Sequence, residues 1–305
     1  MRLRCALLGL VMSAASWAAS DGGTHGTPME LRRSMPFVQV FVDGKGPFVF
    51  GLDTGTGAQA LVSPSVVEKL GLQTKGTVQA GDPSGKAPGQ LPLVQLRSLS
   101  VAGVELRGVT AAVYQPSQAE GPCDGILGFP LFKEWLLTLD YPGSRLTLTA
   151  GHLAQSADRS VVGFRAPDEV PVIDLVIGQE TLPAIIDSRG LGLAIPAAAA
   201  GKIRFLGDPM VIGRGRTITG EFEIRGAQLA EDVQLGGVRI RQPVVVLHPS
   251  FPVGNVGGAV LRQLVVTFDQ RSKLVRLESP HGTLDLPRPQ PRGPAPADGG
   301  TPAGR

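Results

Sequence analysis

The stretch that decides the fold is "FVFGLDTGTGAQALVS" (residues 48–63), in which an apolar run ends at Asp53. A second stretch, "LPAIIDSRGLGLAIP" (residues 182–196), has the same layout around Asp187, but Arg189 stands where the first stretch has Gly. A short apolar run that ends in turn-forming residues is typical of a buried strand. Each stretch therefore predicts a strand that delivers an aspartate to its end.

Two further segments repeat at almost the same spacing. "DGILGFPLFKEWLLTLDY" begins at Asp124 and "VGNVGGAVLRQLVVTFDQ" at Val253, an offset of 129 residues, while the two aspartate motifs are 134 residues apart. Self-similarity at a fixed period indicates a duplicated unit. The apolar-apolar-Gly elements of the two copies are Ile126, Leu127 and Gly128, and Val256 and Gly257.

Composition favours a β protein. Gly (41) and Pro (26) are abundant, aromatic residues are scarce at 5%, and short Val/Leu/Ile runs alternate with turn signals. We expect an all-β, two-lobed fold with a turn at Asp43-Gly44, a short helix at 63–71 and hairpins at 77–94 and 207–224. The predicted layout is a signal peptide (1–20), a linker (21–35), a first lobe (36–150), an inter-lobe connection (151–169), a second lobe (170–283) and a disordered Pro/Gly-rich tail (284–305).

The first 20 residues, "MRLRCALLGLVMSAASWAAS", have a basic start, an apolar stretch and small residues at the end. This pattern is typical of a secretory signal peptide, and the alternative is an uncleaved membrane anchor. We expect an exported, periplasmic or secreted protein with no stable membrane span after cleavage. Cleavage would remove Cys5 and leave Cys123 as the single cysteine, which excludes an internal disulfide.

Charge gives no indication of a nucleic-acid partner. The net charge of +3 falls to +1 without residues 1–20, because these contain two arginines and no acid. Nucleic-acid binding proteins usually carry a clear basic excess. The four histidines are scattered and paired cysteines are absent, so we expect neither a metal site nor a cofactor. We expect a monomer.

Two aspartates brought together can do hydrolytic chemistry without a metal. Their carboxylates cannot both ionise cheaply, so one pKa rises and the pair shares a proton. Such a pair activates a water as base and protonates a leaving amine as acid, which suits peptide-bond hydrolysis. Asp53 and Asp187 are therefore the candidate catalytic residues.

These motifs resemble those of the bacterial two-lobed, retropepsin-like aspartyl proteases, which are related to pepsin and the retroviral proteases. The resemblance covers roughly residues 36–278 and implies a pseudo-twofold fold with a peptide or unfolded-protein substrate between the lobes. It implies dyad-supporting roles for Thr54, Gly55 and Ser188. Two flaps are implied, at 78–93 and 208–224, with Gly81, Asp82, Ser84, Gly85, Gly213 and Gly215 among their residues.

Two residues depart from the family pattern. Arg189 replaces the Gly that follows the second Asp-Ser, and Asn255 interrupts the second apolar element. A guanidinium beside the dyad favours two ionised carboxylates, which removes the shared proton, and its side chain could occupy the water site. Alternatively, Arg189 points away from the cleft, or the loop shifts by one residue through Gly190-Leu191-Gly192. In a silent binding protein, Arg189 would pair with Asp187 or with the C-terminal carboxylate of a bound peptide. Three hypotheses follow: an active endopeptidase, a catalytically impaired protein that binds extended peptides, and a homodimer that uses only the first aspartate.

Overall fold

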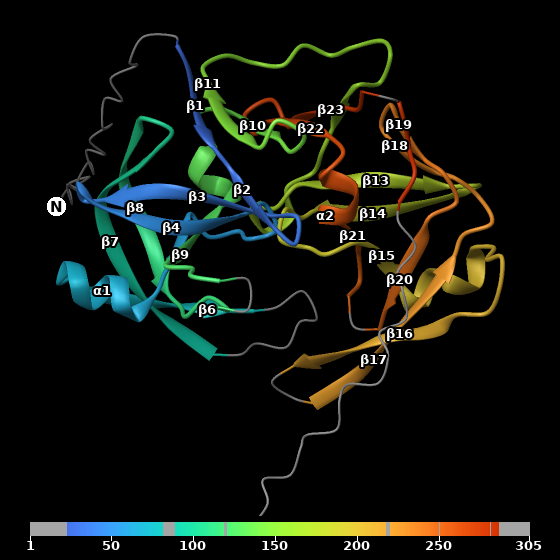
Figure 1. Cartoon of the computed structure of the whole chain (residues 1–305), viewed down its shortest axis with the longest axis horizontal. Coiled ribbons are helices and arrows are strands. Elements are labelled where there is room, and N and C mark those ends of the chain that lie inside the picture. The colour runs from blue at the N-terminus through green and yellow to red at the C-terminus, as the bar shows by residue number, and fades with distance from the viewer. Residues whose placement is uncertain are drawn as a thin grey trace, which may run out of the picture.

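Strands dominate the computed structural model, which describes residues 23–81, 89–118, 121–217, 220–249, 251–280 and 282–286. They form three sheets, and the helices are short, so the predicted all-β class is confirmed. Figure 1 shows the N-terminal strands on one side of the molecule, the C-terminal strands on the other, and strands of both above them. The helical elements are α1 (Pro64–Leu70), α2 (Gly258–Leu261), η1 (Phe129–Phe132), η2 (Pro167–Glu169) and η3 (Ala197–Lys202).

The N-terminal sheet has eight strands, and its Asp-bearing strand lies near its middle. Apolar side chains from its strands are buried, including Phe50 and Leu52, which alternate with Gly51 along the chain. In sheet order, the strands are β2 (Glu30–Arg32), β3 (Met35–Val42), β4 (Lys45–Asp53), β9 (Gly125–Gly128), β5 (Ala60–Val62), β8 (Val104–Val113), β7 (Gly89–Val101) and β6 (Thr74–Ala80).

The C-terminal sheet has ten strands and again holds its Asp-bearing strand in the interior. In sheet order, the strands are β16 (Met210–Thr217), β17 (Gly220–Gln228), β20 (Val244–His248), β15 (Leu193–Pro196), β21 (Gly254–Val256), β14 (Glu180–Ile186), β13 (Val172–Ile177), β18 (Val233–Leu235), β19 (Val238–Ile240) and β24 (Thr283–Leu284).

The two sheets pair their Asp-bearing strands in the same way. β4 runs parallel to β9, which is antiparallel to β5, which is parallel to β8. In the C-terminal sheet β14 runs parallel to β21, which is antiparallel to β15, which is parallel to β20. The segments that correspond in this pairing are those that the sequence comparison aligned.

The third, shared sheet combines strands from both ends of the chain. Its centre is the antiparallel pair β10 and β22, in which Thr138 faces Thr267 and their hydroxyl oxygens lie 2.9 Å apart. These two threonines thus form a contact between the two halves. In sheet order, the strands are β1 (Thr24–Pro28), β11 (Arg145–Thr149), β10 (Leu136–Asp140), β22 (Val265–Asp269), β23 (Leu274–Glu278) and β12 (Val161–Gly163).

Local predictions near the first aspartate are confirmed. Asp43 and Gly44 have φ values of 51° and 76°, the left-handed pair that a tight hairpin turn between β3 and β4 requires. Helix α1 begins after Ser63, whose hydroxyl accepts a hydrogen bond from the Val66 amide, and ends at Gly71 with φ 64°. The hairpins β6–β7 and β16–β17 lie in the segments predicted for them, on the side of the molecule away from the shared sheet (Figure 1).

Two segments that were predicted to be connections contain strands. The segment predicted as a linker, 21–35, contains β1 and β2, because β1 completes an edge of the shared sheet and Met29 is buried. The predicted connection 151–169 contains β12, which pairs with β23. The proposed signal peptide (1–20) and residues 287–305 of the predicted tail lie outside the described residues.

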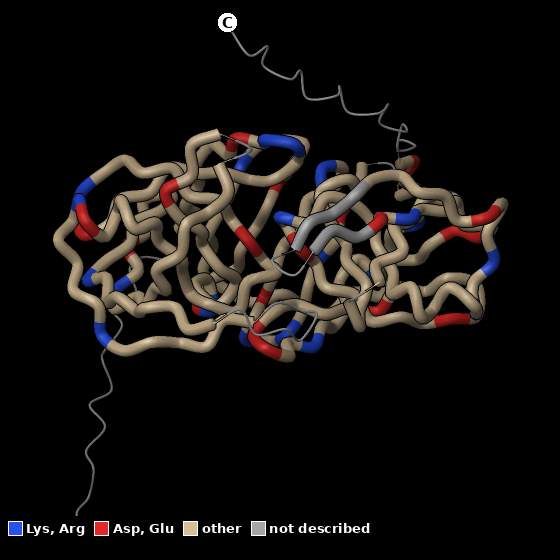
Figure 2. The backbone as a smooth tube through the Cα atoms, turned by 90° about the horizontal axis from the view of Figure 1, so that it is seen from below, with Lys and Arg blue, Asp and Glu red and all other residues tan. Residues whose placement is uncertain are grey.

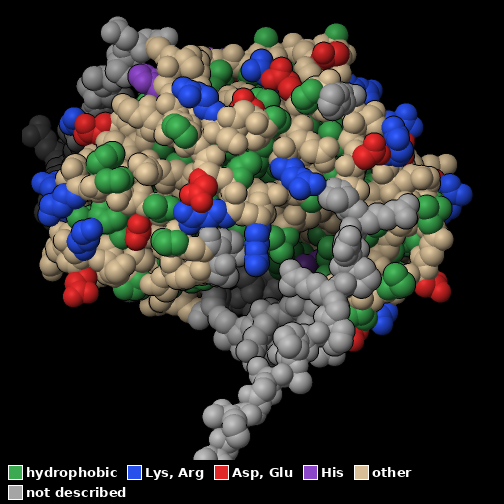
Figure 3. Space-filling view, viewed as in Figure 1, with side chains coloured by type: hydrophobic (Ala, Val, Ile, Leu, Met, Phe, Trp, Pro, Cys, Tyr) green, Lys and Arg blue, Asp and Glu red, His purple; other side chains and the backbone are tan. Residues whose placement is uncertain are grey.

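Basic and acidic residues are interspersed along both halves of the chain (Figure 2). On the face in Figure 3, Lys and Arg likewise alternate with Asp and Glu among uncharged side chains. No helix within the described ranges is long and apolar enough to cross a membrane.

Candidate active site

Asp53 is the last residue of β4, where the strand leaves the N-terminal core. Its parallel neighbour β9 places Gly128 beside it, and Leu127 beside Leu52. Both leucines are fully buried, as are Phe50 and Phe48. The apolar run that precedes the acid in the sequence therefore fixes the position of the strand end, and with it the carboxyl group.

Asp187 occupies the corresponding position in the C-terminal sheet. It follows β14, whose last residue, Ile186, pairs with Val256 in the parallel strand β21. The Asp187 amide donates a hydrogen bond to the Val256 carbonyl oxygen at 3.0 Å. Both aspartates thus stand directly after, or at the end of, a buried strand with a parallel neighbour.

The residues that follow the two aspartates lock the sheets together. The Thr54 amide donates to Ser188 Oγ and the Ser188 amide donates to Thr54 Oγ1, each at 2.9 Å. Each hydroxyl then donates to a carbonyl of the opposite sheet, Thr54 to Ile186 at 2.6 Å and Ser188 to Leu52 at 2.8 Å. Both side chains are 0% exposed. These four bonds bring the two sequence-predicted aspartates into one site.

Gly55 lies between the side chains of Asp53 and Asp187. Gly55 donates its amide to Asp53 Oδ1 at 2.9 Å, and Thr56 donates its hydroxyl to Asp53 Oδ2 at 2.8 Å. A β-carbon on Gly55 would stand only 2.9 Å from Asp187 Cγ. No real β-carbon tolerates that distance, so this position requires glycine.

Asp187 is held by three donors, one of which the sequence analysis missed. Oδ1 accepts the amides of Arg189 and Gly190, at 2.9 and 2.8 Å, and Oδ2 accepts Asn255 Nδ2 at 2.7 Å. Gly190 occupies the position that Thr56 occupies in the first copy, so the second copy lacks that hydroxyl. Asn255 supplies the missing hydrogen bond from β21. The aligned copies carried the sequence signal for this role, because the second copy has Gly190 in place of Thr56 and Asn255 in place of Ile126.

The environment raises the pKa of Asp53 from 3.8 to about 7. Burial is the largest cause and the negative charge of Asp187 the next, while the Thr56 hydroxyl, the charge of Arg189 and the Gly55 amide oppose them. Arg189 favours the ionised form of Asp53, as expected, but it is not the dominant influence. Desolvation and carboxylate repulsion outweigh the guanidinium, and Asp53 keeps a proton up to neutral pH.

The Arg189 side chain reaches across to the N-terminal sheet. Its Nη1 atom contacts the space where a side chain of Gly51 would begin, and its Cζ lies 5.4 Å from the centroid of the Phe37 ring. Phe37 belongs to a small apolar cluster with Met35, Cys123 and the half-buried Val49. Arg189 thus fills a gap that the absent side chain of Gly51 leaves.

Tyr141 is a residue that the sequence analysis did not single out. It is 1% exposed, and its hydroxyl has no hydrogen-bond partner among the described residues. Burial, followed by the negative charges of Asp187 and Asp53, raises the pKa of its phenol. The hydroxyl therefore stays protonated and lies within electrostatic range of both aspartates.

The remaining predicted site residues fall into two groups. The buried apolar-apolar-Gly residues of β9 and β21 support the aspartate strands, and Gly257 begins the turn into α2. Gly213 and Gly215 lie in β16, and Gly81 directly follows β6. Asp82, Ser84 and Gly85 lie outside the described residues.

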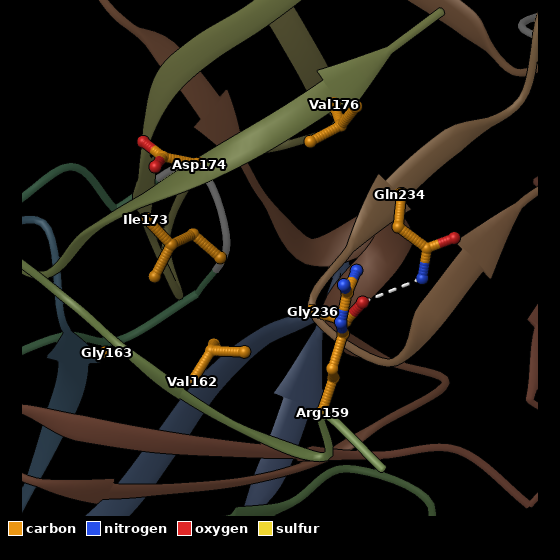
Figure 4. Close-up of a pocket in the computed structure, with 8 residues that line it drawn as sticks. All are labelled: Arg159, Val162, Gly163, Ile173, Asp174, Val176, Gln234 and Gly236. Atoms are coloured by element: carbon orange, nitrogen blue, oxygen red, sulfur yellow. Dashed lines mark hydrogen bonds between the residues drawn. The ribbon is translucent and has the colours of Figure 1, made fainter. Parts of the chain in front are cut away.

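A cavity of about 210 Å³ lies elsewhere, between β12, β13 and the turn that joins β18 to β19. Figure 4 shows one hydrogen bond among its lining residues, in which Gln234 Nε2 donates to the Gly236 carbonyl oxygen at 2.7 Å. Asp174, at its edge, forms an ion pair with Arg165 at 2.7 Å. None of the predicted site residues lines it, so the aspartate pair and this cavity are separate features.

Comparison with known proteins finds a family match in the N-terminal part of the chain. Residues 38–131 match a family model described as "Aspartyl protease". The matched segment begins in β3, ends in η1 and includes Asp53 and the Ile126-Leu127-Gly128 element. No curated protein matches the chain.

We predict that Thr54→Val destabilises the protein strongly. The change keeps the shape of the side chain but leaves the Ser188 amide and the Ile186 carbonyl oxygen without their partner. Each orphaned group costs about 1–3 kcal/mol of unfolding free energy. Urea unfolding measures the loss, and Thr77→Val on the exposed strand β6 is the control. Combining the change with Ser188→Ala should cost less than the sum of the two, since both remove the same network; additive costs would contradict the reciprocal arrangement.

We predict that Asn255→Ile and Gly190→Thr compensate for each other. The first change removes a hydrogen bond to a carboxylate, worth about 1.5–3 kcal/mol. The second alone places a β-carbon against the Asn255 amide, which the structure does not accommodate. Together they import the residues of the first copy, Thr56 and Ile126, so the double variant should be more stable than either single one. Equal or additive losses in urea unfolding would show that Asn255 does not replace the hydroxyl.

We predict that raising the pH from 4 to 8 lowers the free energy of unfolding of the wild type more than that of the Asp53→Asn variant. The folded-state pKa of Asp53 is raised from 3.8 to about 7, so its stabilising contribution is complete below pH 4 and is lost as the pH rises through 7. Asparagine has no such dependence. Urea unfolding at several pH values measures both slopes, with the exposed Asp174→Asn as control. Parallel slopes for wild type and Asp53→Asn would overturn the assignment.

Proposed function

We propose that this chain is an exported aspartic-type endopeptidase, because residues 38–131 match a family model described as "Aspartyl protease". Its substrates are peptides or unfolded proteins, and a water activated between Asp53 and Asp187 hydrolyses the peptide bond. The chain acts as a monomer, with one aspartate from each half.

The observation that carries this proposal is the unequal aspartate pair. Asp53 has a pKa of about 7 and keeps its proton in acid and neutral solution. Asp187 accepts three N–H donors, from Arg189, Gly190 and Asn255, an arrangement that fits a carboxylate. One protonated and one ionised carboxyl group, side by side, are what general acid–base hydrolysis needs.

In the proposed mechanism, Asp187 accepts a proton from the water as its oxygen attacks the carbonyl carbon of the substrate. Asp53 donates its proton to the carbonyl oxygen, which gives a neutral tetrahedral intermediate. The leaving nitrogen then takes the proton from Asp187 and the C–N bond breaks. Asp53 recovers its proton from the intermediate as the carboxyl product forms. The pair returns to its starting state without any other reacting group.

The rest of the architecture supports a cleft for an extended peptide. The equivalent pairing around β4 and β14 supports the predicted duplication into two lobes, 36–150 and 170–283. We propose that the hairpins β6–β7 and β16–β17 are its flaps, since they occupy equivalent places in their sheets. Export is proposed on the signal-like sequence of residues 1–20.

The test is cleavage of a mixed peptide library by the purified protein between pH 3 and 8. We expect cleavage that falls as the pH rises through about 7, where Asp53 loses its proton. Asp53→Asn and Asp187→Asn should each reduce the rate by about 10²- to 10⁴-fold or more, as expected for loss of a general acid or base. Asp174→Asn, which removes an exposed carboxylate, should leave it unchanged.

A folded wild-type protein that cuts no peptide at any pH would contradict the proposal. If Arg189→Gly then gained activity, the arginine would be the inactivating group. If that variant were also silent while wild type bound extended peptides, the protein would be the catalytically impaired binding protein. Activity that survived in Asp187→Asn but vanished on dilution would favour the homodimer.

A further inference from the structure

The Arg189 guanidinium lies on the same face of β4 as the catalytic carboxyl group. Side chains alternate along a strand, so residues 51 and 53 point to one face, while Phe50 and Leu52 point into the core. Nη1 of Arg189 contacts the side-chain position of Gly51. Two residues of a strand span roughly 6.5–7 Å. A fixed positive charge therefore stands about one substrate residue away from Asp53.

Arg189 fits this position because the neighbouring side chain is missing. In the second copy the residue two before the aspartate is Ile185, and the residue two after the first aspartate is Gly55. The first copy has Gly51 two residues before its aspartate. The second copy has Arg189 two residues after its aspartate, and Arg189 contacts the Gly51 position. Gly51 is thus paired with the large, charged side chain of Arg189, whereas the nearest atoms to the side-chain position of Gly55 belong to Asp187.

This charge has no carboxylate partner within the described ranges. Arg189 forms no ion pair there, and its buried Nη1 makes no hydrogen bond. The neighbouring Arg32, whose Cζ lies 4.4 Å from the Phe37 centroid, is by contrast satisfied by Glu30, with two bonds of 2.8 Å. Leaving a partly buried guanidinium hydrogen unpaired is costly. Nη1 itself is buried, but the residue as a whole is half-buried, so a substrate group would meet the guanidinium at its other nitrogens.

We propose that Arg189 binds a carboxylate of the substrate, and that the preferred substrates are peptides with Asp or Glu beside the scissile bond. This inference rests on the proposed endopeptidase function. The charge balance agrees with it: a pair with one proton carries −1, and Arg189 brings the total to zero. An acidic side chain is therefore not repelled by the site, as it would be by the pair alone.

The experiment compares two peptides that differ only by Glu or Gln at a position flanking the cleaved bond. The starting peptide is the best substrate from the library, and both flanking positions are tested. At pH 5.5 to 6.5 we expect wild type to prefer Glu by about 10- to 100-fold in kcat/KM at one of them, the value of a hydrogen-bonded charge pair. The preference should fade below pH 4.3, where the substrate Glu becomes protonated.

Variants test whether Arg189 is the origin of this preference. Arg189→Met keeps a long stem over Phe37 without the charge, and its Glu-to-Gln ratio should fall to about 1 or below. Arg189→Lys should retain part of the preference, because it keeps the charge but loses the planar fork. Arg32→Met is the matched control, since it removes a neighbouring arginine that already has a partner; its ratio should equal that of wild type.

The outcomes separate this inference from the proposed function. Cleavage with a Glu-to-Gln ratio near 1 at both positions, or a ratio unchanged in Arg189→Met, overturns the inference and leaves the endopeptidase intact. If no peptide is cut, the endopeptidase fails, and calorimetric binding of the tightest-binding library peptide, in versions that differ only by Glu or Gln, decides the inference alone. Tighter binding of the Glu peptide that is lost in Arg189→Met supports it, and equal binding overturns it.

Discussion

The reciprocal hydrogen bonds between Thr54 and Ser188 are the constraint on which the site depends. They link two strand ends that are 134 residues apart in sequence, and each hydroxyl also caps a carbonyl of the opposite sheet. Because both residues are fully buried, water cannot replace these bonds. The relative position of the two aspartates is thus set by buried backbone geometry, and the negative charge of Asp187 acts on Asp53.

Around this symmetric lock, the site is asymmetric, and its asymmetries are compensated in pairs. Arg189 is accommodated by Gly51, and the hydroxyl missing at Gly190 is replaced by the amide of Asn255. Considered one at a time, Arg189 and Asn255 are departures from the family motif. Seen with their partners, they form a consistent local packing in which Asp53 and Asp187 have different surroundings. Different surroundings are what assign the roles of acid and base.

Sequence was sufficient for the features that local pattern and repetition encode. The apolar runs before Asp53 and Asp187, the turn at Asp43-Gly44 and the helix after Ser63 follow from periodicity and capping chemistry, and the duplicated spacing placed both aspartates together. It could not show that burial outweighs the charge of Arg189, because desolvation depends on three-dimensional packing. It also missed Asn255 and Tyr141, whose significance comes from residues distant in the chain, and it took β1 for a linker because strand-edge pairing is a long-range event.

The shared sheet has a consequence for how the chain matures. Its central partners β10 and β22 come from segments some 129 residues apart, and β1 at one edge is the first strand described while β23 lies close to the C-terminal end. Contacts of such long range form late in folding. A chain that is still emerging can build the N-terminal sheet, but it cannot close the shared sheet or bring Asp187 to Asp53 until nearly all of it is available. Closure of the shared sheet, and with it completion of the candidate site, therefore waits for these strands.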